Sequence, residues 1–144
     1  MGRGFRLFLK KNTKTGFVNG CFDILHIGHK RLIEFARSKC DHLIIGIDSD
    51  ERVKYLKGPN RPFNSAEIRS EMLLAFSSVD EVRIFDSEET LEKLIKDVGP
   101  DIMVIGSDYL DKRVVGAHHA KKLIYFERIS GYSSSKIFEY SSNR

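Results

Sequence analysis

The chain turns from a predicted strand into a predicted helix at Asn19-Gly20-Cys21-Phe22-Asp23-Ile24-Leu25-His26-Ile27-Gly28-His29. The apolar run at residues 17–21 is typical of a buried strand, and residues 28–39 carry the apolar spacing of a helix. Two histidines with a glycine between them therefore lie where the helix begins. Free backbone N–H groups and the helix dipole attract anions at such a position, and imidazoles add hydrogen-bond donors. The stretch predicts a turn that handles phosphate groups.

Strands and helices alternate along the rest of the chain. Strands are predicted at residues 42–48, 82–85, 102–105 and 123–126, a loop at 48–61, and helices at 64–76, 87–97 and from residue 133 onward. Continuous apolar runs of strand length are typical of parallel strands that are buried on both faces. We therefore expect one α/β domain over residues 16–144, a Rossmann-like doubly wound parallel sheet of about five strands, after a basic leader at residues 1–15.

The polar loops of this predicted sheet fall on one edge. Each loop that carries polar and charged residues follows a strand, namely residues 20–29, 48–61, 106–116 and 127–135. Ligands of doubly wound sheets bind beyond the carboxyl ends of the strands. We therefore expect these loops to form one site.

Composition limits the class of partner. The 144 residues include 24 Lys and Arg against 20 Asp and Glu, a net charge of +4 that suits anionic small molecules. The basic residues are scattered and form no ribonucleoprotein signature, so nucleic acid is not the expected substrate. No apolar run is long enough to span a membrane. Only two cysteines are present, without a CxxC motif, which favours a reduced, cytoplasmic setting.

Three other chemistries find little support. The motifs GxxxxGK[ST] and GxGxxG are both absent, which disfavours P-loop hydrolysis and dinucleotide redox chemistry. Cys21, His26 and His29 are three conceivable zinc ligands, but the strand position directs Cys21 into the packing of the sheet. His118 and His119 are adjacent, and adjacent residues are not expected to face one centre. No metal ligand is therefore assigned.

The motif Gly20-x-Phe22-Asp23-x-x-His26-x-Gly28-His29 resembles the signature of the HxGH nucleotidyltransferases, the cytidylyltransferase-like superfamily. Residues 56–62, 67–69, 105–109 and 114–116 resemble the D-glycero-D-manno-heptose 1-phosphate adenylyltransferase branch of that superfamily. Residues 128–137 resemble the tail motif RTxGxSTTxI, which glycerol-3-phosphate cytidylyltransferases share. The resemblance covers roughly residues 16–140.

This resemblance implies roles for individual residues. His26 and His29 are implied to contact the triphosphate at and beside the reacting phosphorus. Lys57, expected on a mobile loop with Gly58 and Pro59, is implied to bridge the phosphates of the two substrates. Arg69 is implied to reach phosphates, although its helical position alone is also typical of a surface arginine. The other residues implied to bind nucleotide or phosphate are Gly20, Phe22, Asp23, Gly28, Gly106, Asp108, Arg128, Ser133, Ser134 and Ser135.

The implied reaction is transfer of AMP from ATP to a heptose 1-phosphate-like sugar, with release of pyrophosphate. Mg²⁺, held mainly by phosphate oxygens, is the expected cofactor, and a homodimer is the expected assembly. The alternative is a glycerol-3-phosphate cytidylyltransferase that uses CTP, because the phosphate-binding residues suit every nucleoside triphosphate equally. A non-catalytic nucleotide-binding module is a further alternative, and the intact histidine motif and Lys57 argue against it.

Overall fold

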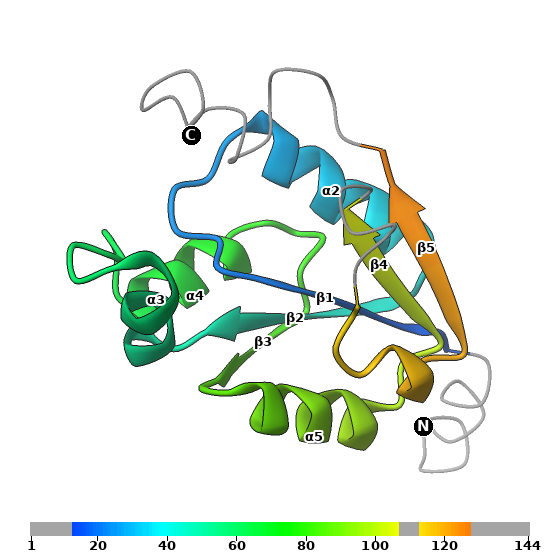
Figure 1. Ribbon diagram of the computed structural model, residues 1–144. Coiled ribbons are helices and arrows are strands. Elements are labelled where there is room, and N and C mark those ends of the chain that lie inside the picture. Colours follow the sequence, from blue (N-terminus) through cyan, green and yellow to red (C-terminus); the bar gives the residue numbers. More distant parts are fainter. Residues whose placement is uncertain (1–12, 107–112, 128–144) are drawn as a thin grey trace, which may run out of the picture.

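A parallel sheet of five strands organises the computed structural model, which describes residues 13–106 and 113–127 (Figure 1). The strand order is β3-β2-β1-β4-β5, and every pairing is parallel. The strands are β1 (Thr15–Gly20), β2 (His42–Asp48), β3 (Glu81–Phe85), β4 (Ile102–Gly106) and β5 (Lys122–Phe126). The predicted Rossmann-like α/β domain with five parallel strands is confirmed. The predicted leader, up to residue 12, and the predicted helix from residue 133 lie outside the described residues.

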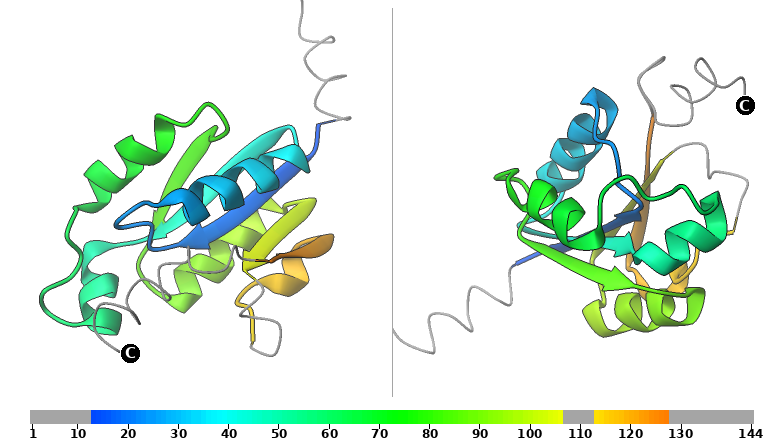
Figure 2. Two further views of the ribbon diagram at one scale, coloured as in Figure 1. Left: turned by 90° about the horizontal axis from the view of Figure 1, so that it is seen from above. Right: turned by 90° about the vertical axis from the view of Figure 1, so that its left-hand side faces the viewer.

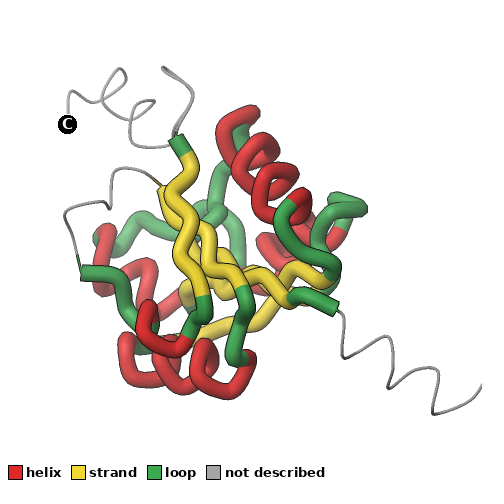
Figure 3. The backbone as a smooth tube through the Cα atoms, turned by 90° about the vertical axis from the view of Figure 1, so that its right-hand side faces the viewer, coloured by secondary structure: helices red, strands yellow, loops and turns green. Residues whose placement is uncertain are grey.

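Helices cover both faces of the sheet. The helices α2 (Ile27–Ser38) and α4 (Ala66–Leu74) lie on one face, and α5 (Glu88–Val98) lies on the other (Figures 1 and 2). The tube trace shows the strands between these helices (Figure 3). The core is split accordingly: Val18, Ile33 and Leu43 pack on the face of α2, and Phe17, Leu91 and Ile95 pack on the face of α5. None of the helices in the described part of the chain has the length and apolar character that crossing a membrane requires.

The predicted helix ends are set by local capping. Ser65 and Ser87 accept backbone N–H groups at the starts of α4 and α5. Gly99 ends α5 in the left-handed region, at φ 54°, which glycine adopts without steric cost.

One element is missing from the sequence-based expectation. Residues expected as a loop form α3 (Asp50–Lys57), which begins at the cap Ser49 and carries Asp50 and Glu51 in its first turn. Only Val53 of this helix is buried, so the apolar spacing that indicates a helix is almost absent. The helix places Lys57 at its last turn, and Gly58 follows as the C-cap. The prediction of Lys57 on a loop is therefore wrong, since the loop begins after it.

The strands β1 and β4 separate toward their carboxyl ends, at the point where the strand order reverses. β1 pairs with β2 along its whole length, from Thr15 to Gly20. With β4, β1 is paired only at Gly16↔Ile102 and Phe17↔Met103. In these two described strands, the carboxyl halves of β1 and β4 therefore diverge. This divergence lies at the topological switch point, where ligands of such sheets bind.

Candidate active site

The two histidines of the strand-to-helix turn hold one another in place. His26 is the N-cap of α2, and its Nδ1 accepts the backbone N–H of Gly28 at 3.0 Å. In return, the backbone N–H of His26 donates to Nδ1 of His29 at 3.2 Å. The ring centroids are 4.0 Å apart. This reciprocal capping satisfies backbone donors at the helix start and fixes the position of both rings.

The same hydrogen bonds decide where each imidazole carries its proton. Since each Nδ1 accepts a backbone N–H, the neutral ring holds its proton on Nε2. Burial lowers the pKa of His26, and burial together with the charges of His26 and Lys57 lowers the pKa of His29 to about 3. Both rings are therefore neutral near pH 7. Each offers an Nε2–H donor of fixed direction.

Phe22 packs against the histidine turn. It is buried, and its ring centroid lies 5.2 Å from that of His29. Its φ of 51° falls in the left-handed region, which few residues other than glycine adopt. Such backbone strain is typical of functional turns.

Asp23 connects the turn to the segment that precedes α4. Its carboxylate is 7% exposed and accepts the backbone N–H groups of Phe63, at 2.7 Å, and Asn64, at 2.9 Å. The side-chain amide of Asn64 donates back to the Asp23 carbonyl at 3.1 Å. This geometry gives Asp23 a positioning role, while its predicted contact with nucleotide stays a prediction.

Arg69 is buried, not a surface arginine. The residue is 1% exposed, and its guanidinium donates to the carbonyl oxygens of Cys21, Asp48 and Asn64 at 2.8–3.0 Å. Its Nη2 donates to the carboxylate of Asp50 at 2.7 Å. Arg69 thus joins the carboxyl ends of β1 and β2 to the start of α3. The surface alternative is excluded, and the implied phosphate contact stays a prediction, with most of the donors already used within the protein.

Lys57 lies close to the histidine turn. Its charge is one of the causes of the lowered pKa of His29. Burial raises the pKa of the Cys21 thiol, and the Lys57 charge opposes that rise. The short helix α3 therefore brings an exposed lysine to the carboxyl edge of the sheet, near enough for its charge to act on His29.

The structure brings most of the predicted residues to one edge. The predicted residues at the carboxyl ends of β1 and β2, or in the segments that follow, are Gly20, Phe22, Asp23, His26, Gly28, His29, Lys57 and Arg69. Gly106 ends β4 on the same edge. Asp108, Arg128, Ser133, Ser134 and Ser135 lie outside the described residues. Sequence reasoning missed Asp50 and Asn64, the partners of Arg69 and Asp23, because no pattern in the chain marks such long-range pairing.

The expectation for the adjacent histidines is wrong. His118 and His119 both reach one carboxylate oxygen of Glu92. Among residues 13–106 and 113–127, the potential metal-ligand side chains that lie close enough together to hold one ion are Glu92, His118 and His119. Cys21, His26 and His29 do not form such a group. Both histidines reach Glu92 because they lie in a tight 3₁₀ turn beside α5.

A parallel α/β sheet with a half-buried HxGH turn at its switch point is the arrangement expected of the cytidylyltransferase-like proteins. A profile of the cytidylyltransferase-like family matches residues 17–142. The chain therefore belongs to the cytidylyltransferase-like family.

Relatives of this chain are longer proteins. It is 49% identical to the bifunctional protein HldE of Campylobacter jejuni subsp. doylei, over 92% of this chain and 29% of the relative. It is 44% identical to the bifunctional protein HldE of Hyphomonas neptunium, over 89% of this chain and 27% of the relative. The chain thus spans less than a third of the length of these relatives.

Solved structures share the fold at low sequence identity. The lipopolysaccharide core biosynthesis protein of Thermoplasma volcanium superposes with a TM-score of 0.68 at 20% identity, over 82% of this chain and 99% of that one. Pantoate-beta-alanine ligase of Francisella tularensis superposes with a TM-score of 0.58 at 20% identity, over 86% of this chain and 62% of that one. At this identity the likeness concerns the fold alone.

Proposed function

We propose that this chain transfers AMP from ATP to a sugar 1-phosphate of the heptose type and releases pyrophosphate. The observation that carries the proposal is the pair of neutral, mutually oriented imidazoles of His26 and His29 beside the ammonium group of Lys57. All three lie at the carboxyl edge of the sheet, where a ligand of this fold binds.

The chemistry follows from these donors. A phosphate oxygen of the sugar attacks the α-phosphorus of ATP in line, and the bond from that phosphorus to the pyrophosphate oxygen breaks. The attacking oxygen is already anionic, so the step needs positioning and charge stabilisation more than a general base. The Nε2–H groups of His26 and His29 donate to phosphate oxygens as their charge changes, and Lys57 bridges the phosphates of the two substrates.

Mg²⁺ belongs to this proposal as a neutralising ion. It keeps several waters and binds phosphate oxygens readily, so it needs few protein ligands. When bound with ATP, it supplies charge neutralisation of the phosphates. We name no protein ligand for it. A homodimer and a setting in the cytoplasm are further parts of the proposal.

The choice of ATP and a sugar acceptor has separate support. Residues 56–62 and 114–116 resemble the heptose branch, and the bifunctional HldE proteins match nearly the whole chain at 44–49% identity. A site that pairs with one base edge leaves buried polar groups unpaired when another base enters. The preference between ATP and CTP is therefore expected to be sharp.

A pyrophosphate-release assay tests the proposal. ATP and CTP are each combined with heptose 1-phosphate and with glycerol 3-phosphate, and the nucleotide product is identified by mass. We expect release with ATP and heptose 1-phosphate alone. Efficient release with CTP and glycerol 3-phosphate, and none with ATP and the sugar, would promote the cytidylyltransferase alternative. Binding of ATP without release for any acceptor would favour the non-catalytic module.

A further inference from the structure

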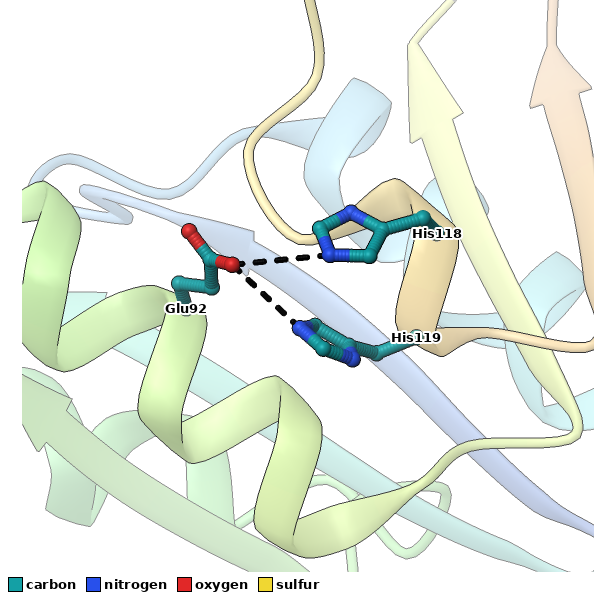
Figure 4. A group of neighbouring side chains, drawn as sticks. All are labelled: Glu92, His118 and His119. Carbon is teal, nitrogen blue, oxygen red and sulfur yellow. Dashed lines mark hydrogen bonds and ion pairs between the residues drawn. The ribbon is translucent and has the colours of Figure 1, made fainter.

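We propose that Glu92, His118 and His119 bind a divalent transition-metal ion such as Zn²⁺, on the face of the sheet opposite α2 (Figure 4). Oε2 of Glu92 lies 3.3 Å from Nε2 of His119 and 3.5 Å from Nε2 of His118. The potential ligand atoms of all three residues lie within 4.8 Å of one another. This site is separate from the histidine turn and independent of the proposed nucleotidyl transfer.

The distances from the carboxylate to the two imidazoles suit zinc. Zinc bonds of about 2.0–2.1 Å in a tetrahedral site place neighbouring ligand atoms about 3.3 Å apart. The two nitrogen–oxygen distances given above match that edge of a tetrahedron. Two imidazoles and one carboxylate also suit zinc, nickel or copper, whereas magnesium and calcium prefer oxygen ligands alone.

The backbone fixes the two histidines over Glu92. They lie in the 3₁₀ turn η2 (Ala117–His119), which begins after Gly116 at φ 75°. A Cβ atom at Gly116 would lie 2.7 Å from Cδ1 of Ile95, a fully buried residue in the turn of α5 after Glu92. Glycine therefore permits a close approach of η2 to α5, and packing holds it there. The ligands come from two rigid elements, which favours a preformed site.

An ion pair alone accounts less well for this arrangement. The rings of His118 and His119 are only 3.9 Å apart, and both converge on the same carboxylate oxygen of Glu92. A simple ion pair needs only one imidazole on that oxygen. A metal ion uses both neutral rings and the carboxylate at once, and a water completes four-coordination.

The ion would join two segments that are distant in the sequence. Glu92 belongs to the helix between β3 and β4, while the histidines belong to the connection between β4 and β5. A shared ion would fasten that connection to α5. Because the ligand set is preformed only in the folded chain, metal would stabilise the fold.

Calorimetric titration of the metal-free full chain with Zn²⁺ tests the site. The variants are E92Q, H118Q and H119Q, and the matched control is H42Q, because His42 forms a similar contact with Glu81, at 3.4 Å, without a second histidine. Loss of partners of metal ligands typically costs 10–100-fold, so loss of a ligand is expected to weaken binding by about 100-fold or more. At the same Zn²⁺ concentration, the wild type and H42Q should each bind one more Zn²⁺ ion per chain than E92Q, H118Q or H119Q.

Two further measurements keep the outcome decisive. Zn²⁺ should raise the Tm of the wild type and of H42Q by several degrees and leave that of E92Q unchanged. Co²⁺ should give the visible absorption of a four-coordinate site in the wild type and H42Q, but not in E92Q, H118Q or H119Q. Should a variant fail to fold, H118Q still carries the test, because the side chain of His118 is 70% exposed. Equal affinity and stoichiometry in the wild type and H118Q, or no binding by the wild type at micromolar Zn²⁺, would overturn the proposal.

Discussion

At the scale of single residues, His26 has an observed structural contact and a proposed catalytic one. Its Nδ1 caps α2, and its Nε2–H is the group that we expect to donate to phosphate. Asparagine also caps helices but lacks the imidazole, so H26N should keep the Tm within a few degrees and lower kcat about 10²–10³-fold, the typical loss for one preorganised donor. H42N is the matched control outside the site. Turnover of H26N near that of the wild type would contradict the catalytic role, whatever its stability.

His29 also makes the stability of the protein depend on pH. Its pKa falls from 6.5 to about 3 on folding, so between these values the unfolded chain binds the proton and the folded chain does not. His29 therefore does not affect stability above pH 6.5. Below that pH the free energy of unfolding falls, by about 2 kcal/mol at a pH of about 5. Urea unfolding of the wild type and H29N at pH values of about 5 and 7.5 measures this contribution. Equal losses in the two proteins would show that other groups are responsible.

At the scale of elements, α3 positions the charge of Lys57 at the carboxyl edge of the sheet. Lys57 lies in its last turn and is exposed, so its removal should cost little packing. K57A should lower kcat/KM at least about 100-fold while the Tm changes by no more than a few degrees, because a positioned cation on phosphate acts in the transition state. K54A, on the same helix, is the control. A large fall in Tm with unchanged kcat/KM would instead make Lys57 a structural residue.

Arg69 holds three elements together at the carboxyl edge. Its removal leaves the carbonyls of Cys21 and Asp48 and the carboxylate of Asp50 without their donor. R69A should therefore lower the free energy of unfolding by about 3 kcal/mol or more, as expected for a broken buried network. R83A, which removes an exposed pair with Glu81, should cost less than about 1 kcal/mol. Denaturant unfolding measures the free energy of unfolding of both variants. If R69A loses as little as R83A, water has replaced the hydrogen bonds of the guanidinium.

The elements also show what a sequence can predict. The strand at residues 42–48 was predicted with its observed bounds because an apolar run of that length has few other solutions. The sequence of α5 also marks both of its ends, with the N-cap Ser87 before it and the C-cap Gly99 after it. α3 escaped prediction because a helix that buries only Val53 has no apolar stripe. The buried hydrogen bonds of Arg69 and the contact of His118 with Glu92 escaped prediction too, because only the fold creates them.

For the whole molecule, the proposed site draws on both halves of the sheet. The histidine turn and Lys57 follow β1 and β2, and Gly106 ends β4 on the other side of the switch point. The strand order was predictable only as a doubly wound class, since strand periodicity does not say which strands are neighbours. The segments that follow β1 and β2 lie at the carboxyl edge, as expected of a parallel sheet, while most of the predicted loops at 106–116 and 127–135 falls outside the described residues.

The short pairing between β1 and β4 implies a line along which the molecule opens. Two register pairs join these strands, against six between β1 and β2. Amides of β4 and β5 should therefore exchange with deuterium earlier than those of β1 and β2, through a partial opening that stops short of global unfolding. Native-state hydrogen exchange followed by mass spectrometry measures the order. A nucleotide seated across the carboxyl ends would bridge both sides and slow that opening, whereas uniform exchange in all four strands would mean that the sheet breathes as one unit.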